Sequence, residues 1–368
     1  MKNGKICVGI THGDINGVGY EVILKIFSEP TMLELCTPVI YGSPKVATYH
    51  RKAMELTTNF VTIQDAKEMV DGRLNLVDCI VDEVKIDFGQ PTEESGKAAL
   101  LALEKAMADY KKGLFDVLVT APINKSAIQS DAFRFPGHTE YIQERVGEGQ
   151  EALMILMNDV MRIALVTTHL PIRDIASAIT KEAIMNKIRI FYETLRKDFN
   201  VSKPRIAVLA LNPHAGDNGL LGSEEQDIII PAMQEMEAEG IMCFGPYAAD
   251  GFFGNKTYEY FDGVLAMYHD QGLAPFKALA MESGVNYTAG LPIVRTSPDH
   301  GTGFDIVGKG IASPDSFREA IYRAIDIFRC RMAFYRNHRN PLRKQYFDKS
   351  NDKEVLDLTK VEESDNTI

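Results

Sequence analysis

The stretch VLAMYHDQG, Val264–Gly272, joins a run of apolar residues to a histidine, an aspartate and an amide. A short apolar run is typical of a buried strand, and polar residues directly after it are typical of a strand end that binds a ligand. The pattern occurs twice more, in ALVTTHLP (Ala164–Pro171) with His169 and in IAVLALNPHAG (Ile206–Gly216) with His214. Three strands that each end beside a histidine predict functional groups gathered at one edge of a sheet.

Short apolar runs alternate with helical periodicity along most of the chain. The pattern predicts strands at residues 5–11, 37–42, 116–122, 151–158 and 162–167, around 206 and around 264, and helices at residues 17–27, 95–113, 181–197, 224–239 and 314–335. Repeated alternation of this kind predicts an α/β fold with mainly parallel strands.

The composition is that of an ordinary globular protein. The chain has 368 residues, of which 45% are hydrophobic and 25% are charged, and its net charge is −11. The negative charge argues against a nucleic-acid partner, because phosphate backbones bind basic surfaces. The five cysteines include no CxxC pair, and no apolar run approaches the roughly 18 residues of a membrane helix. We therefore expect a soluble, cytoplasmic protein with reduced cysteines.

His169, His214 and His269 are candidate ligands of a divalent metal. Neutral imidazole is the commonest protein ligand of transition metals, and three protein ligands leave a position open for substrate. Zinc suits this set best, with cobalt, manganese and magnesium as alternatives. Asp270 and Asp250 are candidates for orienting a ligand or transferring a proton. Such a metal serves alcohol oxidation and hydrolysis equally, so the histidines alone leave the reaction open.

The stretch DHGTGFDIVGKGIASP, Asp299–Pro314, bears on that choice. From His300 onward it resembles the HGSAPDIAGKGIANP loop of the isocitrate and isopropylmalate dehydrogenases. In that superfamily the loop holds the adenosine part of the nicotinamide cofactor. The resemblance implies that NAD or NADP binds at His300, Gly301, Gly303 and Asp305, and it counts against a metal-dependent hydrolase.

Seven further blocks narrow the family. They occur in the order THGDINGVGYE (11–21), VTAPINKSAI (119–128), FPGHTEY (135–141), TTHLPIRDI (167–175), LNPHAGDNG (211–219), AMYHDQGLAPFK (266–277) and GVNYTAGLPIVRTSPDHGTG (284–303). Together they resemble the 4-hydroxythreonine-4-phosphate dehydrogenase family over residues 5 to 340. The blocks NPHAG and MYHDQG are specific to that family.

The resemblance implies a role for individual residues. His169, His214 and His269 match the metal ligands of the family, while the substrate-binding positions are matched by His138, Thr139, Lys277, Asn286 and Arg295. Lys277 and Asp270, with Asp250, are the candidates for proton transfer. The active site is expected at the interface of a homodimer, with His269 completing the metal site of the other subunit.

The implied reaction is an NAD(P)-dependent oxidation of 4-phosphooxy-L-threonine to 2-amino-3-oxo-4-phosphooxybutanoate. The product then loses CO₂ to give 3-amino-2-oxopropyl phosphate, a step towards pyridoxal 5′-phosphate. A phosphorylated four-carbon sugar acid, threonate or erythronate 4-phosphate, is an alternative substrate, because paralogues of the family use the same three histidines.

The resemblance also implies two α/β domains of the isocitrate dehydrogenase type. We expect residues 1–135 with 290–343 to form the first domain and residues 136–289 the second, followed by a polar tail at 344–368. The N-terminal block departs from the family pattern GDPAGIGPE, because Ile15 and Tyr20 replace its two prolines. The turn should survive, since its glycines permit unusual backbone angles.

Overall fold

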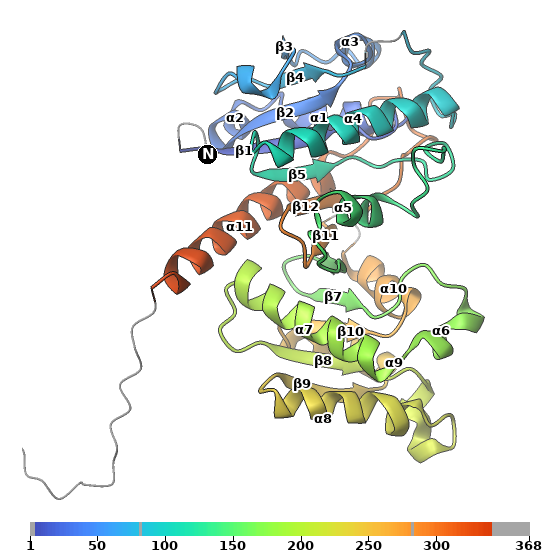
Figure 1. Ribbon diagram of the computed structural model, residues 1–368. Helices are drawn as coiled ribbons and strands as arrows, with labels where there is room; N and C mark the ends of the chain where they lie inside the picture. Colours follow the sequence, from blue (N-terminus) through green and yellow to red (C-terminus); the bar gives the residue numbers. More distant parts are fainter. Residues whose placement is uncertain (1–3, 81–82, 281–282, 341–368) are drawn as a thin grey trace, which may run out of the picture.

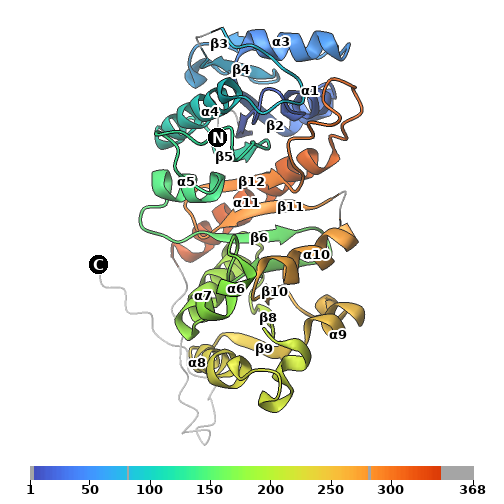
Figure 2. The same cartoon turned by 90° about the vertical axis from the view of Figure 1, so that its right-hand side faces the viewer.

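The computed structural model describes residues 4–80, 83–280 and 283–340 (Figures 1 and 2). Within these residues twelve strands form one sheet, in the order β3-β4-β2-β1-β5-β12-β11-β6-β7-β10-β8-β9. The strands are β1 (Ile6–Thr11), β2 (Cys36–Gly42), β3 (Val61–Ile63), β4 (Asn75–Asp78), β5 (Val117–Thr120), β6 (Leu153–Met157), β7 (Arg162–Leu165), β8 (Arg205–Leu209), β9 (Met242–Tyr247), β10 (Gly263–Ala266), β11 (Val285–Ala289) and β12 (Val294–Pro298).

The described α-helices are α1 (Gly19–Ile26), α2 (Pro30–Leu35), α3 (Pro44–Ala53), α4 (Glu93–Lys111), α5 (His138–Val146), α6 (Ile172–Ala178), α7 (Lys181–Asp198), α8 (Ile230–Ala238), α9 (Ala249–Gly254), α10 (His269–Ala280) and α11 (Asp315–His338). Short 3₁₀ or π turns lie at η1 (Ala66–Glu68), η2 (Pro213–Gly219), η3 (Glu225–Ile229) and η4 (Thr257–Tyr260). No helix among the described residues combines the length and apolar character that a membrane crossing needs.

Helices cover both faces of the sheet. Along β1, Ile6 and Val8 belong to an apolar cluster with α1 and α11, whereas Cys7 points into a second cluster with α4. Successive side chains of a strand point to opposite faces, so the fully buried strand β1 is covered on both sides. This explains why the strand is a continuous apolar run in the sequence.

The predicted α/β class with mainly parallel strands is confirmed. Strands β1, β2, β4 and β5 pair in parallel on one side of the sheet, and β7, β10, β8 and β9 do so on the other. Between them, β11 pairs antiparallel with both β12 and β6, and β6 pairs antiparallel with β7. Each predicted strand and helix has a counterpart, but the predicted helix at 224–239 begins with the π turn η3 before α8.

The helix ends follow from local sequence. Thr92 accepts a hydrogen bond from Ser95 N, and the Ser95 side chain bonds back to Thr92 N, which forms a capping box at the start of α4. Thr180 caps α7 by accepting from Ala183 N. Ser43 caps α3, and Pro44 occupies its first position, where its missing N–H is not needed.

The glycines of the N-terminal block have two different roles. Gly13 has φ +75°, so the expected backbone freedom is used there. At Gly17 and Gly19 the reason is close approach, because an added Cβ would lie 2.6 Å from Thr302 O and 2.0 Å from His12 O. Tyr20, which replaces a proline of the family pattern, is buried and accepts a hydrogen bond from Ser43 N.

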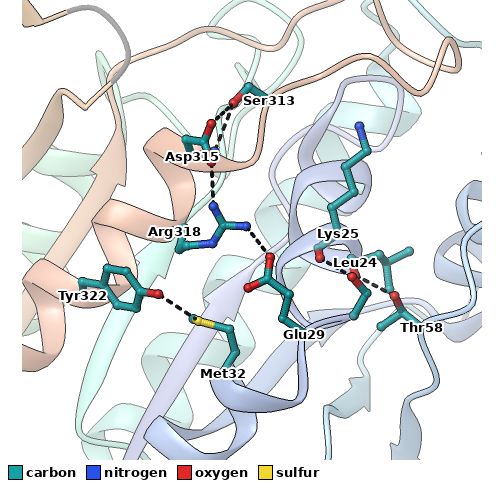
Figure 3. A network of polar contacts seen from close by, with 10 residues as sticks. Leu24, Lys25, Glu29, Met32, Thr58, Ser313, Asp315, Arg318 and Tyr322 are labelled. Atoms are coloured by element: carbon teal, nitrogen blue, oxygen red, sulfur yellow. Dashed lines mark hydrogen bonds and ion pairs between the residues drawn. The ribbon is translucent and has the colours of Figure 1, made fainter.

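The start of α11 is joined to the N-terminal helices by polar contacts (Figure 3). Arg318 donates to Asp315 at 2.6 Å and to Glu29 at 2.8 Å. Tyr322 OH lies 3.5 Å from the sulfur of Met32. Residues 29–32 and 318–322, which are distant in the sequence, therefore pack together.

The predicted division into two domains stays a prediction. The proposed border falls in the sheet between β12 and β11, which are hydrogen-bonded neighbours. The predicted polar tail at 344–368 lies outside the described residues. The five cysteines all lie within the described residues, and no disulfide joins them.

Candidate active site

The three histidines follow three adjacent parallel strands. Strand β10 lies between β7 and β8 and is parallel to both. His169 follows β7, His214 follows β8, and His269 is the first residue of α10 after β10. Parallel strands end at the same edge of a sheet, and ligands of open α/β sheets bind beyond that edge. The structure therefore places the three histidines at strand ends, as predicted.

A cavity of about 340 Å³ opens at this edge. It gathers nine of the predicted site residues: His138, Thr139, His169, His269, Lys277, Asn286, Arg295, His300 and Gly301. His214 and Asp250 line a second cavity, and Gly303 and Asp305 lie further along the loop that follows His300. Asp270 contacts His269 without lining the first cavity.

His169 and His269 form a pair in the first cavity. Their ring centroids are 5.9 Å apart. Asp270 Oδ1 lies 2.6 Å from His269 Nδ1, so the hydrogen bond leaves His269 Nε2 free to face the cavity. Burial lowers the pKa of His169, and the nearby Lys125 lowers it further, which favours the neutral imidazole that metals bind.

His214 lies apart from that pair. It begins a run of left-handed backbone that continues to Asn218, with φ between 42° and 75°. Glu225 anchors the residues before the run by accepting hydrogen bonds from Leu211 N and Asn212 N at 2.8 Å. Within the described part of a single chain, no three His, Cys, Asp or Glu side chains are arranged to hold a metal. The convergence of all three histidines in one chain, which the strand ends suggested, is not observed.

Arg295 is a buried cation beside the cavity. It is 3% exposed, and it donates from Nε to Thr120 Oγ1 and from Nη1 to Thr288 Oγ1, each at 3.1 Å. Burial lowers its pKa to about 10, while Glu140 opposes the shift. No carboxylate of the described residues forms an ion pair with it. A buried charge with only hydroxyl partners is costly, which indicates that it serves an anionic ligand.

Other cavity residues carry polar groups in need of a partner. Asn286 Oδ1 and His300 Nε2 are buried and accept or donate no hydrogen bond within the described residues. Lys277 is paired with Asp299 at 3.3 Å. His138 starts α5, and burial, followed by Arg295 and Lys125, holds the pKa of its imidazole well below the usual range. Because buried polar groups are normally satisfied, the cavity is suited to a polar, anionic molecule.

Three charged residues of the cavity, Lys125, Glu140 and Asp299, were not among the predicted site residues. Lys125 Nζ lies 3.4 Å from His169 Nε2, and Glu140 has a buried Oε2 without a hydrogen-bond partner in the described chain. All three belong to blocks that carry the family resemblance, which was the only available signal. The proximity of Lys125 and Glu140 to the histidines depends on how residues 121–140 fold over the strand ends.

The comparisons with known proteins agree on one family. Residues 34–324 match the sequence model of a protein family, pyridoxal phosphate biosynthetic protein PdxA. The chain is 65% identical over 363 residues to 4-hydroxythreonine-4-phosphate dehydrogenase of Bacteroides thetaiotaomicron, which covers 99% of this chain and 100% of the relative. It is 38% identical over 327 residues to a putative D-threonate 4-phosphate dehydrogenase of Oceanobacillus iheyensis, with 88% and 98% covered.

A solved structure has the same fold. The crystal structure of 4-hydroxythreonine-4-phosphate dehydrogenase from Klebsiella pneumoniae superimposes with a TM-score of 0.78 at 32% identity, over 89% of this chain and 99% of that one. The chain has an α/β sheet with a polar cavity at its strand ends, and its relatives are dehydrogenases. It is therefore an oxidoreductase that acts on a CH–OH group. More narrowly, the chain belongs to the pyridoxal phosphate biosynthetic protein PdxA family.

Proposed function

We propose that the chain oxidises 4-phosphooxy-L-threonine with NAD or NADP to 2-amino-3-oxo-4-phosphooxybutanoate, which loses CO₂ to give 3-amino-2-oxopropyl phosphate. The observation that carries the proposal is a cavity lined by a pair of histidines and by Arg295. This arginine is buried and forms no ion pair with a carboxylate of the described residues. The name of the relative that is 65% identical supports the same substrate. The product belongs to pyridoxal 5′-phosphate synthesis.

The substrate's anionic groups have partners in the cavity. Arg295 offers a fixed guanidinium fork to the phosphate, and Asn286 and Thr139 offer polar groups beside it. His138, held neutral by its burial, binds through a ring nitrogen and adds no charge. The phosphate of the bound substrate would then neutralise the positive charge of the buried Arg295.

The histidine pair fits part of a divalent metal site. His169 is favoured in its neutral form, and Asp270 orients His269, so two imidazole nitrogens are available as ligands. When bound, zinc, or alternatively cobalt, magnesium or manganese, supplies a Lewis acid for an oxygen of the substrate. The third ligand in our proposal is His214 of a second copy of the chain. This revises the assignment of His269 as the residue that crosses, because His269 lies with His169.

Apolar surface beside both histidines supports such a dimer. Ile172, close to His169 in sequence, is 84% exposed, and Leu220, close to His214, is 78% exposed. Contact between two copies would bury these side chains while bringing His214 to the other cavity. A homodimer in the cytoplasm with shared sites is thus part of the proposal.

Lys277 is the proton carrier that the geometry favours. It lines the cavity and contacts Asp299, whereas Asp270 is engaged with His269 and Asp250 lies in the second cavity. A lysine in this position accepts or returns the proton of the substrate hydroxyl while Asp299 keeps its amine in place. Asp250 lines the same second cavity as His214, so in our proposal it would reach the substrate only from the second copy of the chain.

The loop after Asp299 fits a nicotinamide cofactor. His300 Nε2 is a buried polar atom without a partner in the described chain, and a Cβ added to Gly301 meets no atom within 4 Å. The loop therefore offers an unused ring nitrogen and open space beside the cavity. NAD or NADP supplies the hydride acceptor, and Gly303 and Asp305 complete the proposed contact surface.

The alternative substrate, D-threonate 4-phosphate, differs by a hydroxyl in place of the amino group. The name of the relative from Oceanobacillus iheyensis supports it. Of the two carboxylates that line the cavity, Asp299 is paired with Lys277 while Glu140 Oε2 has no hydrogen bond within the described residues. A free carboxylate binds an ammonium group better than a hydroxyl, so we favour the amino acid.

A coupled assay tests the proposal. Purified protein is incubated with each divalent metal, NAD⁺ or NADP⁺, and either 4-phosphooxy-L-threonine or D-threonate 4-phosphate, and reduced nicotinamide is followed by absorbance. We expect turnover that needs metal and is faster with the amino acid. Faster turnover of the threonate would assign the alternative substrate, and no reduction with either compound would refute the dehydrogenase.

A further inference from the structure

Helix α1 contacts the proposed cofactor loop through two charged residues one turn apart. Lys25 Nζ donates to Gly310 O at 2.9 Å and to Ala312 O at 2.7 Å. Glu21 Oε1 accepts from Ala312 N at 3.0 Å and from Lys25 Nζ at 2.7 Å. The two side chains thus bind the backbone of the loop at residues 310 and 312, and they also bind each other.

The pair is held in a low-dielectric environment. The Glu21 side chain is 0% exposed and that of Lys25 is 21% exposed. Glu21 Oε2 is buried and lacks a hydrogen-bond partner within the described residues. Removing Lys25 would leave a buried carboxylate with one amide as its partner, so the pair and the loop are energetically coupled.

The start of the loop is held by the residues just before α1. Val18 N donates to Thr302 O at 2.9 Å, and a Cβ on Gly17 would lie 2.6 Å from the same oxygen. One short segment, residues 17–25, therefore fixes the loop at Thr302 and again at Gly310 and Ala312. The residues between these points include Gly303 and Asp305.

From this double attachment we propose that Glu21 and Lys25 are positioning residues that keep the 300–312 loop in its cofactor-binding conformation. The inference rests on the proposed function, in which this loop binds NAD or NADP. A loop that is ordered before the cofactor arrives loses less conformational entropy on binding. The effect should therefore appear in the affinity for the cofactor and not in the affinity for the phosphorylated substrate.

The test compares Lys25→Met with a matched control, Lys105→Met. Lys105 and Asp109 are also an i,i+4 pair, at 2.9 Å, with side chains 26% and 0% exposed, but they lie on α4 and contact Asp65 and Lys112. The first measurement is hydrogen–deuterium exchange of peptides covering residues 300–312 in the full-length, cofactor-free protein. The second is kcat and KM for NAD⁺ or NADP⁺ and for the phosphorylated substrate.

We expect Lys25→Met to speed exchange in the 300–312 peptides and to raise the cofactor KM by about 5-fold or more, with a nearly unchanged substrate KM. Lys105→Met should change neither, and Lys25→Arg, which can still donate to both carbonyls, should restore most of the cofactor affinity. If Lys25→Met does not fold, Glu21→Gln, which keeps an acceptor for Ala312 N, serves as the second variant with the same expectation.

Two outcomes would overturn the role of Glu21 and Lys25 while leaving the proposed function intact. They are an active Lys25→Met enzyme with an unchanged cofactor KM, and equal increases of the cofactor and substrate KM values, which would mean general loosening of the site. A wild-type protein that neither binds nor reduces NAD⁺ or NADP⁺ overturns the proposed function, and the inference with it. The wild-type assay therefore separates the two failures.

Discussion

Two buried arginines of this chain have opposite surroundings. Arg331, 2% exposed, donates to both carboxylate oxygens of Asp198 at 2.7 and 3.0 Å and to Tyr287 OH at 2.8 Å. Arg295 is nearly as buried, and its hydrogen-bond partners among the described residues are the hydroxyls of Thr120 and Thr288. An arginine paired in this way stabilises the fold, whereas an unpaired one is retained at a cost to stability because a ligand needs it.

The two arginines therefore respond differently to replacement by methionine. Arg295→Met should raise the KM for the phosphorylated substrate by about 10- to 150-fold, since it removes a charge-assisted contact worth roughly 1.5–3 kcal/mol. It should leave the free energy of unfolding unchanged or slightly higher, because an uncompensated buried charge is removed. Arg331→Met should lower that free energy by about 3–5 kcal/mol, because it strands Asp198. Urea unfolding and steady-state kinetics check both, and an unchanged KM for Arg295→Met would place the phosphate elsewhere.

Glu140 is the residue on which the choice of substrate depends in our proposal. Glu140→Gln should lower kcat/KM for 4-phosphooxy-L-threonine by about 10-fold or more relative to D-threonate 4-phosphate, because the neutral amide attracts an ammonium group less. Glu144→Gln, one turn later on α5 and exposed, is the control. A fall in kcat/KM that is equal for the two substrates would show that Glu140 does not recognise the amine.

At the scale of elements, α1 and α3 meet around aromatic and imidazole rings. His50 Nε2 donates to Ile15 O at 2.8 Å, and its ring lies 5.3 Å from that of Tyr20 and 4.8 Å from that of Phe88. Burial lowers the pKa of His50 to about 4. The ordinary value of about 6.5 applies in the unfolded chain.

The stability of these elements should consequently fall in acid. Between about pH 6.5 and pH 4 the unfolded state binds a proton at His50 that the folded state does not, so stability present above pH 6.5 is lost as the pH falls. The loss is about 1.4 kcal/mol per pH unit for this group. His50→Gln should make the pH dependence of urea unfolding shallower by about that amount between pH 4.5 and 6. Parallel curves for the two proteins would contradict the assignment.

The sequence pattern predicts β1, β2, β5, β6, β7, β8 and β10, but it misses the edge strands β3, β4 and β9 and the central strands β11 and β12. Strands such as β1 are buried on both faces and therefore stand out as apolar runs. The segment that forms β11 and β12 contains Gly290, Pro292 and Pro298, which interrupt its pattern. These strands gain their place by pairing with β6 and β5, which are distant in sequence. No local signal encodes such pairing.

The same reason limits what the sequence says about the site. Family resemblance picked out Asn286 and Arg295, but their convergence requires that β11 pairs with β12. The strand-end pattern correctly put the three histidines at one edge. It did not encode the left-handed run that begins at His214, a residue that lines a different cavity from the other two. Backbone of that kind is set by its anchors, here Glu225, and not by periodicity.

At the scale of the whole molecule, the question is which histidine comes from the second copy. His169 and His269 share one cavity, and His214 lines another. Each site of our proposed dimer therefore combines His169 and His269 of one chain with His214 of the other. The earlier expectation, with His269 crossing, would combine His169 and His214 of one chain. The two arrangements predict different results when inactive variants are mixed.

The decisive experiment uses two mixed dimers, each isolated with two affinity tags from co-expressed variants. In a dimer of His214→Ala with His269→Ala, both arrangements put the two defects in one site and leave the other intact, so about half of the wild-type activity per dimer should return. In a dimer of His169→Ala with His269→Ala, our arrangement leaves one defect in each site, and activity should stay near that of the single variants.

Recovery to about half of the wild-type activity in this second dimer would mean that His269 comes from the other chain. No recovery in the first would mean that His214 and His269 of each site come from the same chain, because every site would then lack one imidazole. Metal content per dimer, measured on the same samples, should follow the number of intact sites, since a site with two imidazoles binds the metal more weakly.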